Sequence, residues 1–193
     1  MKIKKLISAL VLGSMLVGLS GCNITDFSAE NLLRPPKAVG DEAEIEQLIA
    51  KTADSGYTLK YPKNGKFRSA IIMTDLDGND SNEAVAFFRN SAETSSVHML
   101  VMYSKDNSWE IVSDNIFETT DIDSVDFADL TGNGKAEIIV NSTTYTPNVG
   151  KLSCYSYSEG KTNEVGSGQS CSSFVTGDFD NDGTSEIMSL VLY

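Results

Sequence analysis

The chain is poor in the residues from which most catalytic and nucleic-acid-binding sites are built. Its 193 residues include a single histidine, His98, and 15 basic residues against 27 acidic ones. The net charge of −12 disfavours nucleic acid and anionic lipid headgroups as partners, because like charges repel. The sequence contains no G-x-S-x-G elbow, no H-E-x-x-H helix and no glycine-rich phosphate loop. We therefore expect that the protein is not an enzyme, and that His98, which falls in a β-like run, is a packed or surface residue.

Long apolar runs are scarce as well. Residues 6–19 form one, which is too short for an ordinary membrane-spanning helix. It follows three lysines and ends in Leu19-Ser20-Gly21-Cys22. This order resembles a secretory signal with a bacterial lipobox. The resemblance implies a signal peptide over residues 1–21, a lipid on Cys22, and a protein anchored in the cell membrane on its extracytoplasmic face. A plain secretory signal is the alternative.

Cleavage of such a signal would remove Lys2, Lys4 and Lys5 and lower the net charge from −12 to −15. Residues 22–40 contain Pro35-Pro36 and little apolar periodicity, which is typical of a tether. Residues 41–56 place apolar side chains at helical spacing behind an acidic first turn, and predict one amphipathic helix. With Cys22 assigned to the lipid, Cys154 and Cys171 remain, either as a disulfide or as two free thiols.

From Tyr57 onward, short β-rich runs alternate with turn residues, and one loop pattern occurs three times. The loops cover residues 75–83, 129–137 and 178–186, and their starts are 54 and 49 residues apart. We call them the first, second and third loop and number the positions of each from 1 to 9. Every loop has aspartate at position 1, oxygen-bearing side chains at positions 3 and 5, and glutamate at position 9.

Alternating oxygens of this kind favour calcium, which takes six to eight oxygen ligands and tolerates irregular geometry. The candidate ligands are Asp75, Asp77, Asn79 and Glu83; Asp129, Thr131, Asn133 and Glu137; and Asp178, Asp180, Asp182 and Glu186. An EF-hand would need glutamate at position 12, where this chain has Ala86, Val140 and Ser189. The number of carboxylates predicts affinity in the order third, first, second, and leaves open whether the second loop is occupied. Hydrogen-bonded turns without metal are the simpler alternative.

The loops and their β-like flanks resemble the FG-GAP and VCBS repeats of integrin α-subunit propellers and bacterial surface proteins. The resemblance implies a mainly β fold, calcium as cofactor, and four strands per repeat. Residues 57–193 then form a partial β-propeller of about two and a half four-stranded antiparallel blades, preceded by the amphipathic helix. We expect a fragment of a longer propeller, with assembly between chains or a small open stack of sheets as alternatives. The lipobox, the RPPK segment and the helix also resemble surface lipoproteins of Gram-positive gut bacteria, which implies no activity.

These features favour a non-catalytic binding or adhesion module for an extracellular glycan or protein. Two alternatives are a structural surface protein that uses calcium only for folding and, less favoured, an extracytoplasmic hydrolase fragment. Four aromatic residues, which could contact a ligand or simply pack between strands, are Trp109, Tyr145, Tyr155 and Tyr157.

Overall fold

The computed structural model describes residues 40–192, apart from positions 55, 147 and 159. The expected signal peptide, the lipidation site at Cys22 and nearly all of the tether lie outside the described residues. In the described part of the chain, no helix has both the length and the apolar character that crossing a membrane requires.

A helix, α3 (Asp41–Ala53), opens the described chain, and it ends three residues before the predicted boundary. Its first turn carries Asp41, Glu42 and Glu44, which interact favourably with the positive end of the helix dipole. Ile45, Ile49 and Ala53 recur at helical spacing and are all buried. The amphipathic pattern therefore gives α3 one face that packs against the rest of the fold.

Eleven strands follow within the described residues, and all of their pairings are antiparallel. The first sheet has the order β1-β3-β4-β5, with β2 also paired to β3. The second sheet has the order β6-β7-β8-β9, and the third is the β10–β11 hairpin. Their bounds are β1 Tyr57–Leu59, β2 Ile71–Thr74, β3 Glu83–Asn90, β4 Val97–Lys105, β5 Ser108–Phe117, β6 Ile122–Ala128, β7 Glu137–Thr143, β8 Gly150–Ser158, β9 Lys161–Cys171, β10 Ser173–Gly177 and β11 Glu186–Leu190.

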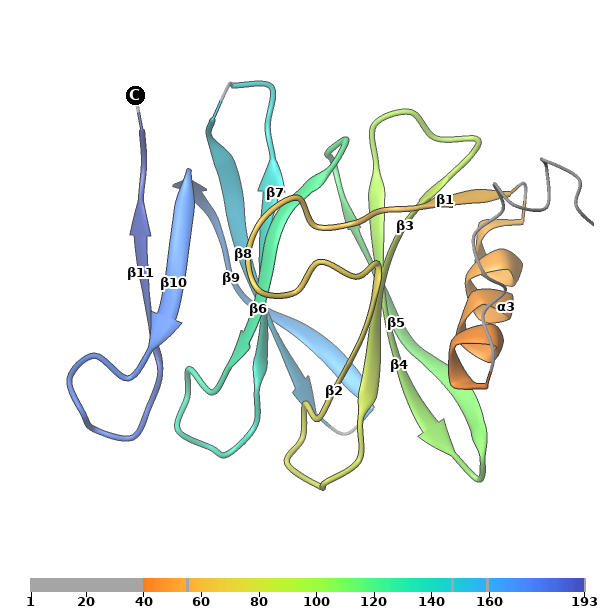
Figure 1. The fold of residues 1–193 in the computed structure, drawn as a ribbon, viewed down its shortest axis with the longest axis horizontal. Coiled ribbons are helices and arrows are strands. Elements are labelled where there is room, and N and C mark those ends of the chain that lie inside the picture. Colours follow the sequence, from red (N-terminus) through yellow and green to blue (C-terminus); the bar gives the residue numbers. More distant parts are fainter. Residues whose placement is uncertain (1–39, 55, 147, 159, 193) are drawn as a thin grey trace, which may run out of the picture. The chain divides into compact units, whose positions relative to one another are not determined.

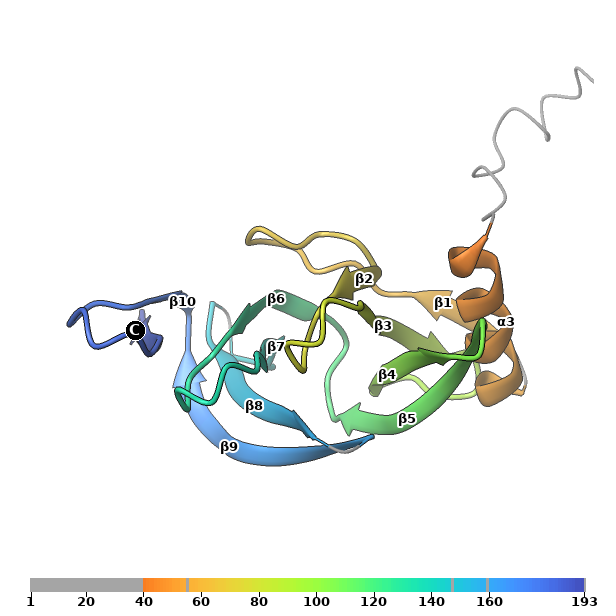
Figure 2. The same ribbon diagram turned by 90° about the horizontal axis from the view of Figure 1, so that it is seen from below.

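The sheets are stacked as successive layers, with α3 on the outer face of the first sheet (Figures 1 and 2). Strand β3 explains why the first sheet is covered on both faces. Its sequence EAVAFF is a continuous apolar run after the glutamate, and all six residues are buried. Val85 and Phe87 belong to the core shared with the second sheet, whereas Ala84, Ala86 and Phe88 pack in the core that contains α3. A smaller core, which includes Ile139 of β7 and Ile187 of β11, joins the second and third sheets.

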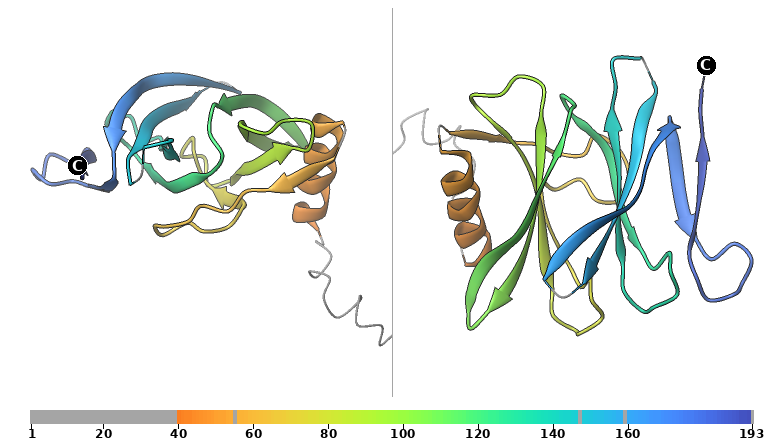
Figure 3. Two further views of the ribbon diagram at one scale, coloured as in Figure 1. Left: turned by 90° about the horizontal axis from the view of Figure 1, so that it is seen from above. Right: turned by 180° about the vertical axis from the view of Figure 1, so that it is seen from behind.

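The outermost hairpin differs from the inner layers because one of its faces is exposed. Val175 and Met188 are direct partners across β10 and β11, and they are 55% and 59% exposed. Leu190, two residues further on the same face, is 49% exposed. Figure 3 shows this hairpin as the last layer of the described chain.

The segment between β1 and β2 connects the first two sheets by backbone hydrogen bonds. Lys63 donates its N–H to the carbonyl of Ile122 at 3.2 Å, and Asn64 donates to the carbonyl of Asp123 at 2.7 Å. Figure 1 shows this segment crossing from β1 toward β6 before the chain returns to β2. The sequence did not predict the crossing, nor strand β1, which has only three residues.

The mainly β fold with one preceding helix is confirmed for the described residues, and the structure has free thiols rather than a disulfide. Cys154 and Cys171 are unbridged. Cys171 of β9 lies opposite Gly150 of β8, and Gly150 is four residues before Cys154 along β8. At about 3.3 Å per residue this is roughly 13 Å, well beyond the ~7 Å Cα separation that a disulfide can span. The strand register therefore excludes the bridge.

Candidate metal-binding loops

The three loops occupy equivalent places in the three sheets. The first joins β2 to β3, the second joins β6 to β7, and the third joins β10 to β11. All three lie at the same edge of the layers, as Figures 1 and 3 show from opposite sides. In each loop the glutamate at position 9 is the first residue of the returning strand: Glu83, Glu137 and Glu186.

A common set of hydrogen bonds folds the backbone around the aspartate at position 1. In the first loop, Asp75 accepts from the N–H of Asn79 through Oδ1 and from that of Asp80 through Oδ2. Glu83 accepts from the N–H of Leu76 at 2.8 Å. The other two loops repeat these bonds: the N–H groups of positions 5 and 6 donate to the aspartate at position 1, and the N–H of position 2 donates to the glutamate at position 9. The acceptors are Asp129 and Glu137 in the second loop. They are Asp178 and Glu186 in the third loop. The repeated residue types thus specify a repeated loop geometry.

Each loop places positions 4 and 6 in the left-handed region of φ. Position 6 holds Asp80, Gly134 and Gly183; glycine adopts such φ values freely, and aspartate does so more readily than most residues. Position 4, which sequence reasoning missed, holds Gly78, Gly132 and Asn181, with φ between 66° and 75°. Glycine or asparagine at position 4 of all three loops is a signal that could have been read from the sequence, because these residues adopt left-handed φ most readily.

The loops also contact one another from layer to layer. Ala136 of the second loop donates its N–H to the carbonyl of Leu76 at 3.0 Å, and Ser185 of the third donates to the carbonyl of Asp129 at 2.8 Å. A Cβ on Gly78 would lie 2.8 Å from the carbonyl oxygen of Gly134. The loops therefore form a continuous edge, and a side chain at Gly78 would force the backbone at this contact to shift.

The first loop concentrates carboxylates in a partly buried position. Ligand oxygens of Asp75, Asp77 and Glu83 lie within 4.8 Å of one another. Glu83 is only 3% exposed. Oδ1 of Asp77 is buried and has no hydrogen-bond partner. Because a buried charged oxygen without a partner is costly, this arrangement suits a cation that Asp75, Asp77 and Glu83 would hold together.

The electrostatics of the first loop reflect this crowding. Burial raises the pKa of Glu83, and the charges of Asp77 and Asp75 raise it further, which outweighs the hydrogen bond from Leu76. For Asp75, burial acts to raise the pKa, but the backbone N–H groups of the loop outweigh it and lower the pKa. On the second sheet, burial followed by the charges of Glu83 and Asp77 raises the pKa of Tyr157 to about 12. Negative charge is thus only partly balanced within this loop.

The other two loops differ in charge and exposure. In the third loop, Asp178, Asp180, Asp182 and Glu186 bring four ligand oxygens within 4.8 Å, and the three aspartates are exposed. Exposed acidic groups are common in proteins that bind no metal. The second loop has two carboxylates, those of Asp129 and Glu137, besides Thr131 and Asn133, and forms no comparable group within the described chain.

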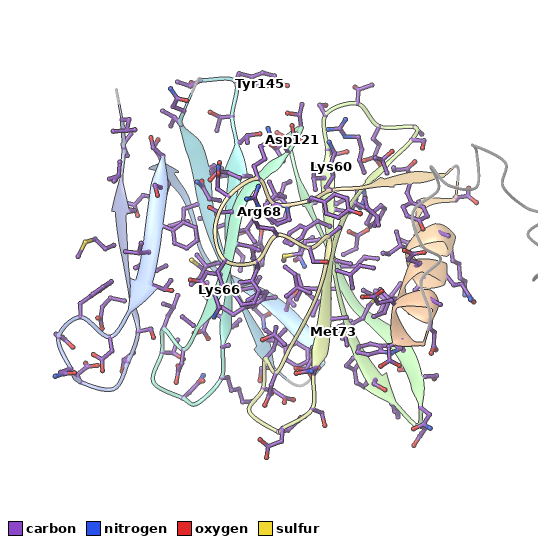
Figure 4. All side chains as sticks on the ribbon, in the orientation of Figure 1. Lys60, Lys66, Arg68, Met73, Asp121 and Tyr145 are labelled. Carbon is purple, nitrogen blue, oxygen red and sulfur yellow. The ribbon has the colours of Figure 1, made fainter. Side chains whose placement is uncertain are left out.

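The four aromatic candidates separate into two kinds. Trp109, Tyr155 and Tyr157 are between 5% and 7% exposed and belong to the cores. Tyr145, which lies between β7 and β8, is 90% exposed. Its label in Figure 4 stands at the end of the sheets opposite the loops. Burial therefore leaves Tyr145 as the one member of this set that is open to a ligand.

The histidine is a packed residue, as expected. His98 of β4 is 6% exposed and stacks on Phe88, with ring centroids 4.7 Å apart. Its Nδ1 lies 2.9 Å from both carboxylate oxygens of Asp114, and its Nε2 lies 3.0 Å from Glu93. Burial acts to lower the pKa of His98, but the hydrogen bonds and charges of Glu93 and Asp114 outweigh it and raise the pKa.

Comparisons of the chain with protein-family models, with curated proteins and with solved structures found no match.

Proposed function

We propose that the first and third loops bind calcium, and that the ion stabilises the edge at which the layers meet. Asp75, Asp77 and Glu83 would hold it in the first loop, and Asp178, Asp180, Asp182 and Glu186 in the third. The observation that carries this proposal is the buried, unpartnered Oδ1 of Asp77 within a group of three carboxylates. A hydrogen-bonded turn alone does not account for that oxygen, whereas a hard divalent cation does.

The same proposal extends to the architecture: the sheets are consecutive blades of a propeller of the FG-GAP/VCBS kind. Two features support it. The second sheet is a four-stranded antiparallel meander, β6-β7-β8-β9, and each sheet carries its acidic loop between strands in equivalent places. The exposed apolar pair of Val175 and Met188 fits either a further sheet or a neighbouring chain. Light scattering over a concentration series separates the two, because only assembly between chains depends on concentration.

We further propose that the protein is a non-catalytic binding module, held on the extracytoplasmic face of a membrane by a lipid on Cys22. Calcium-stiffened loops at one edge would leave the opposite end of the sheets, with the exposed Tyr145, free for an extracellular ligand. The second candidate function, a structural protein that needs calcium only for folding, requires the same loops but no ligand.

The calcium proposal is tested by isothermal titration of the full chain with calcium. Asp77→Asn and Asp180→Asn each replace a position-3 carboxylate by an amide of similar shape in the first and third loop. Because affinity depends on the number of charged ligands, each variant should weaken one class of site by about tenfold or more. Asp106→Asn makes the same change in the exposed turn between β4 and β5 and serves as the control.

Calcium uptake that is unchanged in both loop variants would overturn the proposal. Uptake that is reduced equally by Asp106→Asn would show general charge attraction instead of two built sites. Labelling with palmitate in a bacterial host, compared between the full chain and Cys22→Ser, tests the lipid anchor separately.

A further inference from the structure

A cavity lined by residues of the first and second sheets lies at the end of the sheets opposite the acidic loops. It has a volume of about 420 Å³, within the range of small-molecule sites. Its walls come from the β3–β4 turn, the end of β5 with the residue that follows, and the β7–β8 turn. Each of these turns is at the far end of a strand that begins at an acidic loop. The lining residues are Glu93, Ser95, Ser96, Ile116, Glu118 and Tyr145.

Two apolar side chains in this lining are open to solvent. Ile116 of β5 is 59% exposed, and Tyr145 is 90% exposed. Figure 4 shows Tyr145 at this end of the sheets. An exposed aliphatic chain and an exposed aromatic ring in one cavity offer a surface to the apolar part of a ligand.

The carboxylate of Glu93 is held in position by its neighbours. Its Oε2 accepts from the hydroxyl of Ser96 and lies 3.0 Å from Nε2 of the buried His98. The hydrogen bonds from Ser96 and then His98 lower the pKa of Glu93, so this group is ionised at neutral pH. Its Oε1 has no hydrogen bond within the described residues and can accept from a donor on a ligand.

The cavity carries an excess of negative charge. Glu118 is exposed and forms no ion pair in the part of the chain that the structure describes. None of the lining residues is cationic. His98 contacts both Glu93 and Asp114, so its charge of at most +1 cannot balance these two carboxylates and Glu118 as well. A cationic ligand is therefore complementary to the cavity.

The mixed character of the lining distinguishes this cavity from the acidic loops. Calcium takes six to eight oxygen ligands, whereas the two carboxylates here share the lining with an isoleucine and a tyrosine. A lysine or arginine side chain fits better, because it carries its charge at the end of an apolar stem. The face of an aromatic ring such as that of Tyr145 also attracts such a cation.

We propose that this cavity binds a lysine or arginine side chain of a partner protein. Glu93 and Glu118 pair with the charged group, while Ile116 and Tyr145 contact the stem. This inference deepens the proposed binding function and rests on it, naming a basic protein as the ligand, but it involves none of the calcium ligands. The net charge of −12 acts in the same direction, because it attracts a basic partner before contact.

The test is NMR titration of the isotope-labelled full chain with three short blocked peptides, which contain only alanine apart from a central lysine, arginine or norleucine. Norleucine keeps an unbranched apolar stem but has no charge. The lysine and arginine peptides should shift the backbone signals of residues 93–96, 116–118 and 144–146. The norleucine peptide should bind at least about fivefold more weakly, because it cannot pair with the carboxylates.

Three variants locate the site. Glu118→Gln and Tyr145→Leu each change an exposed side chain, so the melting temperature should not change. Each should weaken binding of the lysine peptide by about threefold to fivefold, through the loss of one charge or of the aromatic ring. Glu93→Gln should weaken it at least as much. Glu164→Gln, on the exposed part of β9, is the matched control for the loss of one charge and should bind as the parent does.

Two results would overturn the inference. One is the absence of shifts at these positions with both basic peptides, and the other is equal binding of the norleucine peptide. A loss of binding in Glu164→Gln as large as that in Glu118→Gln would also refute the site, because net charge alone would then explain the attraction. Calcium titration of the same samples separates the two proposals, since normal calcium uptake without peptide binding refutes the cavity site alone.

Discussion

The first and third loops share one hydrogen-bond frame but differ in what surrounds it. At position 2, Leu76 of the first loop is fully buried in the core between two sheets, whereas Phe179 of the third loop is 51% exposed. At position 9, Glu83 is 3% exposed, and Glu186 is more accessible. The third loop has more carboxylates, but the first holds its carboxylates in a less aqueous place. Equal sequence patterns therefore differ in their contribution to stability, because the loops occupy different places in the stack of sheets.

The largest expected effect concerns position 2. Leu76→Ala should lower the free energy of unfolding by about 3 kcal/mol, because it leaves a cavity in a closed core. Phe179→Ala should lower it by less than about 1 kcal/mol, since half of that ring already contacts water. Urea unfolding of both variants measures the difference. Equal losses would show that the two loops are packed alike.

Calcium should separate the loops next. With calcium at about 100 times its dissociation constant, one site stabilises the native state by about 2.7 kcal/mol. Because its site is expected to be at least tenfold weaker, Asp77→Asn should lose about half or more of the stabilisation that calcium gives through the first loop. In calcium-free buffer it should be as stable as the parent, because the substitution removes a buried charged oxygen that has no partner. Thermal unfolding with calcium and with chelator gives both values. A variant that is strongly destabilised in chelator would show that Asp77 supports the fold without metal.

Substitutions at position 4 test the backbone geometry of the loops, and their expected effect on stability is smaller. Gly78→Ala combines a left-handed φ of 75° with a Cβ placed 2.8 Å from the carbonyl oxygen of Gly134, and should cost about 2 kcal/mol. At position 4 of the third loop the native residue, Asn181, already carries a Cβ. Asn181→Ala should therefore lower the free energy of unfolding by less than about 1 kcal/mol. Gly160→Ala, with φ of 67° and nothing within 4 Å, isolates the φ contribution. If Gly78→Ala and Gly160→Ala cost the same, the contact between loops is unimportant.

Glu83 should give the calcium-free protein a dependence on pH. Its folded pKa is raised above the ordinary value of 4.5, so the folded state binds the proton more tightly than the unfolded state does. Stability should therefore fall as the pH rises from 4.5 through the raised folded pKa. Glu83→Gln should remove this fall, and Glu118→Gln, at an exposed position, controls for the loss of one charge. The midpoint of urea unfolding, measured across this pH range in chelator and then again in calcium, gives this pH dependence. A fall that persists in Glu83→Gln would place its origin elsewhere.

The smallest effect comes from His98, and it must be separated from that of Glu83. Its pKa is raised above 6.5, so its stabilisation is fully present below pH 6.5 and is lost as the pH rises through the folded pKa. The two windows begin at different pH values, 4.5 for Glu83 and 6.5 for His98, and the Glu83→Gln and His98→Gln variants tell the two contributions apart. His98→Gln should flatten the stability profile above pH 6.5 only. NMR titration of the imidazole checks the assignment, and a folded pKa below 6.5 would contradict it.

Much of the fold could be read from the chain alone. Four strands per repeat over two and a half repeats make ten expected strands, which correspond to β2–β11. Each of the three loops lies between two of these strands. Strand β1 was missed because three residues carry too little periodicity to be distinguished from a turn. The second half of β9, GSGQSC, is polar and rich in glycine, so its sequence does not indicate a strand. Backbone pairing with β8 maintains it as a strand up to Cys171.

The sequence by itself determined the conformation of the loops. Aspartate, a residue with left-handed φ and glutamate at fixed intervals decide which backbone N–H groups donate hydrogen bonds to the two carboxylates. These hydrogen bonds lie within each loop. Only the tertiary structure decided which loop is buried and that Cys154 and Cys171 stay apart. These outcomes depend on register and on the stacking of layers distant in the chain. Burial is a property of the neighbours that a residue acquires, and no short pattern encodes them.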